Sequence, residues 1–253
     1  MKASRSPLPG ILRPIGGLAA RVYGGVVGMR NGSFDCGQRE SSRLPIPVIS
    51  VGNLSAGGTG KTPMVQWVVG QLLEEGRRPI IAMRGYKAER GGRGGGKRSD
   101  EQIEHEERFS GVPVVVGAKR YEAVGEFLAE NDGRYDCCVL DDGFQHRQLG
   151  RDLDLVLIDA TRSVFEDRLL PCGYLREPVE SLGRADGVVL MNGDLRDEDR
   201  VDLLRVQVGK YHGRPPIARF RHSWKGLRFF EGGVEGGGED EVVHRVGRLR
   251  GCV

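Results

Sequence analysis

From residue 45 onward, the sequence alternates short apolar runs with segments in which apolar residues recur at helical spacing. The apolar runs predict strands at residues 46–51, 79–83, 113–116, 136–140, 154–158 and 187–191. The helical spacing predicts helices at residues 61–75, 118–130 and 196–208. Strands that alternate with helices are typical of βαβ units, so we expect an α/β fold with a mainly parallel sheet flanked by helices.

Residues 1–35 have a different pattern. Apolar residues recur at helical spacing from Leu8 to Val26, and every charged residue before Asp35 is positive, which predicts an amphipathic helix. Arg13 and Arg21 interrupt the apolar stretch, so it is too short for a bilayer span of roughly 20 residues, and a cleavable signal peptide is not expected. Two interpretations stay open: a helix packed on its own domain, and an interfacial helix that enters a membrane surface.

Two further segments differ from the α/β pattern. Residues 87–99 are rich in glycine and arginine without an apolar anchor, which predicts a mobile loop. Residues beyond 228 have little apolar content and no periodicity, which predicts a poorly ordered tail. The expected organisation is therefore a membrane-associating helix at residues 1–35, an α/β domain at 36–228 and a tail at 229–253.

Composition and charge narrow the class of protein. The chain has 253 residues, enough for one large α/β domain. Its 38 basic and 35 acidic residues give a net charge of +3, too small an excess to indicate nucleic-acid binding. The five cysteines have no metal-ligand spacing, so we expect a reducing compartment with neither disulfides nor zinc. No feature of the sequence indicates a protein partner.

The stretch VGNLSAGGTGKT (51–62) combines a strand end, a glycine-rich loop and a helix start. In that order, backbone N–H groups and the helix terminus can surround a phosphate, Lys61 can reach the terminal phosphates, and the Thr62 hydroxyl can bind Mg²⁺. Ser55 stands where such loops usually have their first glycine. The sequence therefore predicts a P-loop that binds a nucleoside triphosphate through Ser55, Ala56, Gly57, Gly58, Thr59, Gly60, Lys61 and Thr62.

Acidic residues follow two of the predicted strands. Asp141 and Asp142 follow one strand and Asp159 follows the next, at the edge where open parallel sheets bind ligands. Adjacent carboxylates repel each other unless a cation is near, so Asp141 and Asp142, with Thr62, are our predicted Mg²⁺ ligands. For Asp159, a cap or turn residue at the strand end is the favoured interpretation.

Several motifs together resemble the tetraacyldisaccharide 4'-kinase (lipid A 4'-kinase) family over about residues 8–228. They are VGNLSAGGTGKTP (51–63), MRGY (83–86), SDE (99–101), DDGFQHRQLGRDLDLVLIDA (141–160) and LLPCGYLREP (169–178). The family has Ser or Thr at the position of Ser55. The resemblance implies transfer of the ATP γ-phosphate to the 4'-hydroxyl of a tetraacylated glucosamine disaccharide 1-phosphate. It also implies a peripheral position on the cytoplasmic face of the inner membrane.

The resemblance also implies catalytic roles. Asp100 lies at the position of the family's catalytic aspartate, so we predict that it is the base that takes the hydroxyl proton. Without the resemblance, a solvated acid in an acidic helix at residues 100–107 would be the favoured interpretation. Besides Lys61, we predict that Arg84, Arg176 and Glu177 organise phosphates and metal, the alternative for the last two being a surface ion pair. His146 is equally compatible with a buried structural histidine and a catalytic one.

The sequence departs from the family in one large respect. It shows neither the GIxxPxxF-like segment of the family's second lobe nor the family's later Asp-His motif. We therefore expect ATP binding to be retained and catalysis to be impaired. Two alternatives stay open: an inactive nucleotide-binding remnant, and a regulatory P-loop NTPase. The second is suggested by MNGD (191–194), which loosely resembles a guanine-binding motif.

Overall fold

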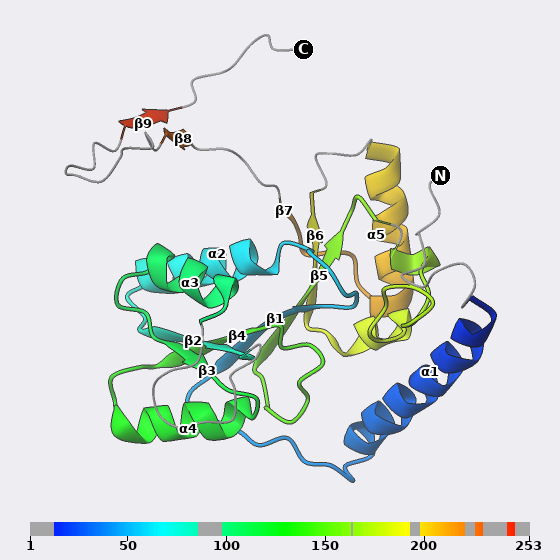
Figure 1. The fold of residues 1–253 in the computed structure, drawn as a ribbon, viewed down its shortest axis with the longest axis horizontal. Coiled ribbons are helices and arrows are strands. Elements are labelled where there is room, and N and C mark those ends of the chain that lie inside the picture. The colour runs from blue at the N-terminus through cyan, green and yellow to red at the C-terminus, as the bar shows by residue number, and fades with distance from the viewer. Residues whose placement is uncertain are drawn as a thin grey trace. The chain divides into compact units, whose positions relative to one another are not determined.

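Seven parallel strands form the central sheet of the protein, in the order β3-β2-β4-β1-β5-β6-β7 (Figure 1). This computed structural model describes residues 13–85, 98–162, 164–192, 198–220, 226–229 and 242–245. The strands are β1 (Val48–Asn53), β2 (Pro79–Met83), β3 (Val114–Val116), β4 (Cys137–Asp141), β5 (Leu153–Asp159), β6 (Gly187–Met191) and β7 (Ala218–Phe220). Because β1 lies between β4 and β5, the loop that follows β1 is flanked by the carboxyl ends of these two strands.

Helices cover both faces of the sheet (Figure 1). They are α1 (Arg13–Asp35), α2 (Lys61–Glu74), α3 (Asp100–Arg108), α4 (Arg120–Glu130) and α5 (Glu198–His212), with short 3-10 helices η2 (Val164–Glu166) and η3 (Val179–Arg184). Successive strand residues point to opposite faces. In β4, Val139 packs with the side chains of α2, whereas Cys138 and Leu140 pack with those of α4. In β6, Val188 and Leu190 pack with α5.

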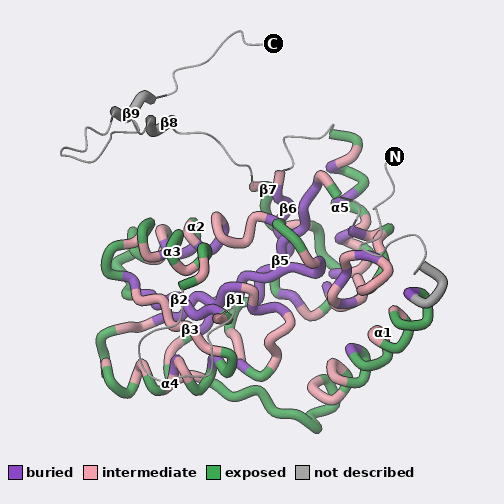
Figure 2. The backbone as a smooth tube through the Cα atoms, in the orientation of Figure 1, coloured by how far each residue is buried: buried purple, intermediate pink, exposed green. Residues whose placement is uncertain are grey.

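The inner strands of the sheet are buried because both of their faces are covered, whereas the edge strands β3 and β7 are partly exposed. All residues of β2, β4 and β6 are buried (Figure 2). This explains why the strands appear in the sequence as continuous apolar runs rather than as an alternating pattern. The core therefore holds the carboxyl ends of β1, β4 and β5 as a rigid edge.

The chain divides into two compact units, Met1–Phe220 and Arg221–Val253. In the second unit, β8 (Gly226–Phe229) pairs antiparallel with β9 (Val242–Arg245). Apart from β9 and the end of β8, the predicted tail at 229–253 lies outside the described residues. Most of the predicted mobile loop at 87–99 lies outside them too.

The structure confirms the α/β fold class and each predicted strand and helix, with shifts of a few residues at their ends. It adds β7, which is too short to show a pattern in the sequence. The N-terminal segment forms α1, a helix of 23 residues. None of the described helices has both the length and the hydropathy that a bilayer span requires.

Candidate functional site

The loop between β1 and α2 is held in shape by contacts among its own residues and by contacts with another segment of the chain. Gly57 and Gly60 have φ angles of 115° and 79°, a region that favours glycine. Inside the loop, the Asn53 side-chain amide donates to the Thr59 hydroxyl at 2.6 Å, and both residues are buried. Outside it, the Ala56 N–H donates to the carbonyl of Tyr174 at 2.7 Å. Contacts within the protein therefore hold the glycine loop in this shape.

Beneath the loop, β1 approaches a neighbouring turn very closely. A Cβ at Gly52 would lie 2.6 Å from the backbone nitrogen of Phe144, which follows β4. A side chain at this position would push the two segments apart. Gly52 therefore allows the phosphate loop and the acidic turn after β4 to lie side by side.

Asp142 lies beside the phosphate loop and is surrounded by cations. Its backbone has φ of 53°, which is unusual for a residue other than glycine. Arg176 donates to both of its carboxylate oxygens at 2.8 Å, and the Lys61 ammonium lies 3.7 Å away. Burial raises the pKa of Asp142, but the hydrogen bonds and charge of Arg176 and the charges of Lys61 and Arg120 outweigh it and lower the pKa. Asp142 is therefore held as a carboxylate.

Asp141, the last residue of β4, has a different partner. The Nε2 of His105 in α3 lies 3.2 Å from its Oδ2, and both side chains are buried. Glu101 is one turn earlier on the same helix. Burial, and then the negative charges of Asp141 and Asp142, raise the pKa of Glu101. Three carboxyl groups therefore share one neighbourhood next to Lys61.

Asp100 begins α3 and is exposed at this edge of the sheet. Ser99 caps the helix, its hydroxyl accepting from the Gln102 N–H at 3.2 Å. Acidic residues in a first helical turn are stabilised by the helix dipole. The location of Asp100 agrees with either interpretation made from the sequence, a base for the acceptor or a solvated acid.

The oxygen ligands at this edge fit Mg²⁺ in the way that nucleotide enzymes use it. Among the described residues, no group of three or more His, Cys, Asp or Glu side chains is arranged to hold a metal by itself. Mg²⁺ usually takes one or two carboxylates and completes its shell with substrate phosphates and water. Both oxygens of Asp142 are taken by Arg176, which leaves Asp141 as the carboxylate better placed for a cation. Thr62 lies in the first turn of α2, as predicted.

The other predicted residues lie at two separate places. Arg84 is exposed and directly follows β2, so it lies at the same carboxyl edge of the parallel sheet. Burial, and then the charges of nearby guanidinium groups including Arg84, lower the pKa of Arg120. Glu177 is fully buried, and its carboxylate contacts α1. It accepts from Arg184 at 2.7 Å and from Asn31 at 2.8 Å, and Arg30 lies 3.4 Å away. Its carboxylate therefore joins α1 to the domain.

Two weaker candidates from the sequence have ordinary surroundings. Asp159 accepts from both the N–H and the hydroxyl of Thr161, at 3.0 and 2.7 Å, which is the geometry of a turn at a strand end. Burial, and then nearby guanidinium groups, lower the pKa of His146 to about 4. His146 is therefore neutral near neutral pH.

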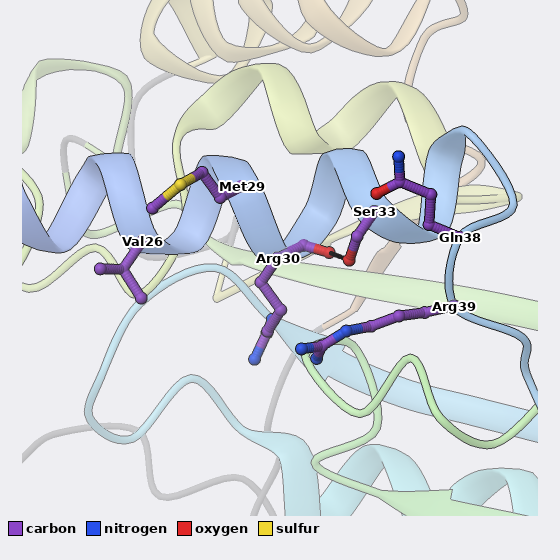
Figure 3. Close-up of a pocket in the computed structure, with 6 residues that line it drawn as sticks. All are labelled: Val26, Met29, Arg30, Ser33, Gln38 and Arg39. Atoms are coloured by element: carbon purple, nitrogen blue, oxygen red, sulfur yellow. Dashed lines mark hydrogen bonds between the residues drawn. The ribbon is translucent and has the colours of Figure 1, made fainter.

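One side of α1, with both polar and apolar residues, contacts the domain, and an apolar stripe on another side does not. The Tyr23 hydroxyl donates to the carbonyl of Arg176 at 2.9 Å, and Val27 is buried. An outward stripe of α1, visible as exposed tube in Figure 2, consists of apolar side chains that are each more than half exposed: Leu18, Val22, Val26 and Met29. Next to it lies a cavity of about 550 Å³, shown in Figure 3 and lined by Val26, Met29, Arg30, Ser33, Gln38 and Arg39.

Sequence reasoning missed three residues that the fold brings to the phosphate loop. Asn53 ends β1, His105 lies on α3 and Arg120 begins α4. His105 had a usable signal, because it is four residues after Glu101 and so lies on the same face of a helix. Arg120 lies four residues after β3, at the start of α4, and its burial could not be read from the sequence.

Comparisons with known proteins find similar sequences and a similar fold. The sequence model of a family described as "Tetraacyldisaccharide-1-P 4'-kinase" matches residues 11–225. Two similar relatives are both named tetraacyldisaccharide 4'-kinase. One, from Chlorobium luteolum, is 41% identical over 211 residues and the other, from Pseudomonas aeruginosa, is 39% identical over 209. The matches cover 78% and 79% of this chain but 58% and 60% of the relatives, so the chain spans about three-fifths of their length.

A solved structure is also similar. It is LpxK from Aquifex aeolicus, determined in complex with ATP. It is 29% identical in sequence and superposes with a TM-score of 0.61, covering 83% of this chain and 82% of that one.

Proposed function

The chain belongs to the tetraacyldisaccharide-1-P 4'-kinase family, and from this we propose that it is an ATP-dependent kinase acting on an acylated disaccharide lipid. The acceptor would be the 4'-hydroxyl of a tetraacylated glucosamine disaccharide 1-phosphate, which is the reaction of the family. The observation that carries the proposal is the position of Lys61. Its ammonium lies at the helix start that closes the glycine loop, 3.7 Å from the carboxylate of Asp142, which follows the neighbouring strand β4.

In the proposed reaction, the 4'-hydroxyl oxygen forms a bond to the γ-phosphorus while the bond from that phosphorus to the β,γ-bridging oxygen breaks, and ADP leaves. The hydroxyl proton passes to a carboxylate, for which we propose Asp100. The residues of this chain act by positioning and by charge. The Ala56 amide donates to Tyr174, so the amides of residues 57–60, with Lys61, would hold the triphosphate. Arg176 would keep Asp142 ionised beside it.

Mg²⁺, bound by Asp141 and Thr62 together with phosphate oxygens, would neutralise charge on the transferred phosphoryl group. Arg84 is proposed to add positive charge at the same edge. Glu177 is proposed to act indirectly, because Arg184, Asn31 and Arg30 occupy its carboxylate.

We further propose that α1 meets the cytoplasmic face of the inner membrane, where the lipid substrate would be found. The support is the exposed apolar stripe of α1, which has no covering element in the described part of the chain. The cavity beside the stripe combines apolar Val26 and Met29 with the guanidinium groups of Arg30 and Arg39 (Figure 3). Such a lining suits an anionic amphiphile.

The test is a mass-spectrometric assay for phosphate gain. The full chain is incubated with ATP, Mg²⁺ and a tetraacyl disaccharide 1-phosphate in detergent micelles, beside Lys61→Ala and Asp100→Ala. We expect product with the parent chain and a loss of at least about 100-fold in each variant. Lys119→Ala is the matched control, because this lysine is exposed and pairs with Glu122 on the surface.

Each outcome separates the alternatives. No product from the parent chain, together with ATP binding by calorimetry, would show a nucleotide-binding remnant and overturn the kinase proposal. Tighter binding of GTP than of ATP would favour the regulatory NTPase. Equal product from all variants would overturn the assignment of the site.

A further inference from the structure

His105 is a buried histidine with one hydrogen-bond partner. It lies on α3 with its side chain fully buried, and its Nε2 is 3.2 Å from Oδ2 of Asp141. Among the described residues, none lies within hydrogen-bond distance of its Nδ1. The contact joins residues 36 positions apart in the sequence.

If His105 served only to fill the core, its buried imidazole would lower the stability of the folded chain. A buried polar atom without a partner costs free energy, on the order of 1–3 kcal/mol. A leucine of similar volume would fill the space beneath α3 without this cost. Among the described residues, the one polar contact of the imidazole is with Asp141, an acid of the phosphate-binding edge. A role at that acid accounts for the histidine better than a role in packing.

We propose that His105 is a positioning residue for Asp141. An ionised carboxylate can only accept hydrogen bonds, so Nε2 carries the hydrogen and donates it to Oδ2. Fixing Oδ2 sets the plane of the carboxylate and leaves Oδ1 to bind the Mg²⁺ of the bound nucleotide. The proposal rests on the proposed function, since it concerns the same site.

The contact also fixes α3 relative to β4. Glu101 lies one helical turn from His105, and its raised pKa reflects burial and then the charge of Asp141. Both residues therefore face the same acid. Asp100, the proposed base, begins this helix. The His105–Asp141 hydrogen bond thus sets the distance between the helix that carries the proposed base and the strand that carries the proposed metal ligand.

The experiment measures metal binding rather than turnover. Mn²⁺ serves as the paramagnetic substitute for Mg²⁺ and is titrated into the full chain with bound ATP, with free Mn²⁺ followed by electron paramagnetic resonance. We expect His105→Leu to weaken Mn²⁺ binding by about 10-fold or more, the usual effect of removing a partner behind a metal ligand. His105→Gln, whose amide can donate from nearly the same position as Nε2, should recover most of the affinity.

His212→Leu is the matched control. His212 is also buried, but its ring nitrogens contact the carbonyls of Ala185 and Arg214, far from Asp141 in the sequence and in the fold. Its loss should lower thermal stability without changing Mn²⁺ affinity. ATP affinity measured with EDTA, which reports the glycine loop and Lys61, should be the same in all variants.

Three results would decide the matter. Equal Mn²⁺ affinity of His105→Leu and the parent chain would overturn the positioning role while leaving the proposed function intact. Equal losses in His105→Leu and His105→Gln would also overturn it, because a donor would then not suffice. Failure of the parent chain to bind ATP would overturn the proposed function itself.

Discussion

The guanidinium of Arg176 donates to both carboxylate oxygens of Asp142, at 2.8 Å each. The same guanidinium contacts Oδ1 of Asn53, the last residue of β1. One side chain therefore joins the strand that enters the phosphate loop to the acid that follows the neighbouring strand. This geometry depends on the planar, forked shape of arginine.

Arg176→Lys should be harmful although it keeps the charge. A lysine ammonium cannot replace the forked contacts of Arg176 with the two Asp142 oxygens and with Asn53. We therefore expect the free energy of unfolding to fall by about 1 kcal/mol. The loss is modest because the Arg176–Asp142 pair is partly exposed to solvent. Urea unfolding measures it. Arg205→Lys, at an exposed pair with Asp202, should change stability by less than about 0.5 kcal/mol, and equal effects of the two would contradict the prediction.

Glu177→Gln should loosen α1. The carboxylate is fully buried, and its loss leaves Arg184 and Arg30 without their counter-charge. We expect a loss of about 2–4 kcal/mol in unfolding free energy, together with faster proteolysis within α1. Glu198→Gln removes an exposed carboxylate that also bonds an arginine, Arg219, and should have little effect. If α1 stays as resistant to protease as in the parent chain, the anchoring role is wrong.

His146 should make the protein less stable in mild acid. Its pKa is about 4 in the folded chain, because of burial and then of nearby guanidinium groups. The unfolded chain has a pKa of about 6.5 and takes up a proton that the folded chain does not, so stability falls as the pH drops from about 6.5 toward 4. The ring is partly exposed, so we expect about 1–2 kcal/mol.

Urea unfolding near pH 7 and near pH 5 checks this prediction. The decrease in unfolding free energy between pH 7 and pH 5 should be smaller in His146→Gln, because a glutamine side chain does not titrate in this range. A pH dependence identical to that of the parent chain would assign the effect to other groups.

The cysteines should differ in reactivity. Burial raises the pKa of Cys137 and Cys138 to about 12, so both remain thiols, whereas Cys36 is exposed and Cys172 is partly exposed. Iodoacetamide at about pH 8, followed by peptide mapping, should label Cys36 and Cys172 well before the β4 pair. Rapid labelling of Cys138 in the native chain would show that the sheet opens.

The parts of the fold that could be predicted from the sequence are those set locally. The strand, loop and helix around Lys61 are contiguous, and each residue type there has a local reason. The contacts that could not be predicted join distant segments. His105 meets Asp141 because α3, which packs against α2 and β3, brings His105 to the end of β4. No local pattern in the sequence states which face of an acidic helix will be buried. Glu177 is adjacent to Arg176, yet the chain turns it toward α1.

Arg176 is held at two ends. Its carbonyl accepts from Tyr23 of α1, and its guanidinium holds Asp142 beside the phosphate loop. A single residue therefore separates the helix proposed to rest on lipid from the acid that contacts Lys61. If α1 rests on lipid as proposed, a shift of that helix would reach the Asp142 carboxylate through Arg176 alone, and lipid contact would then change the charge that faces a bound nucleotide.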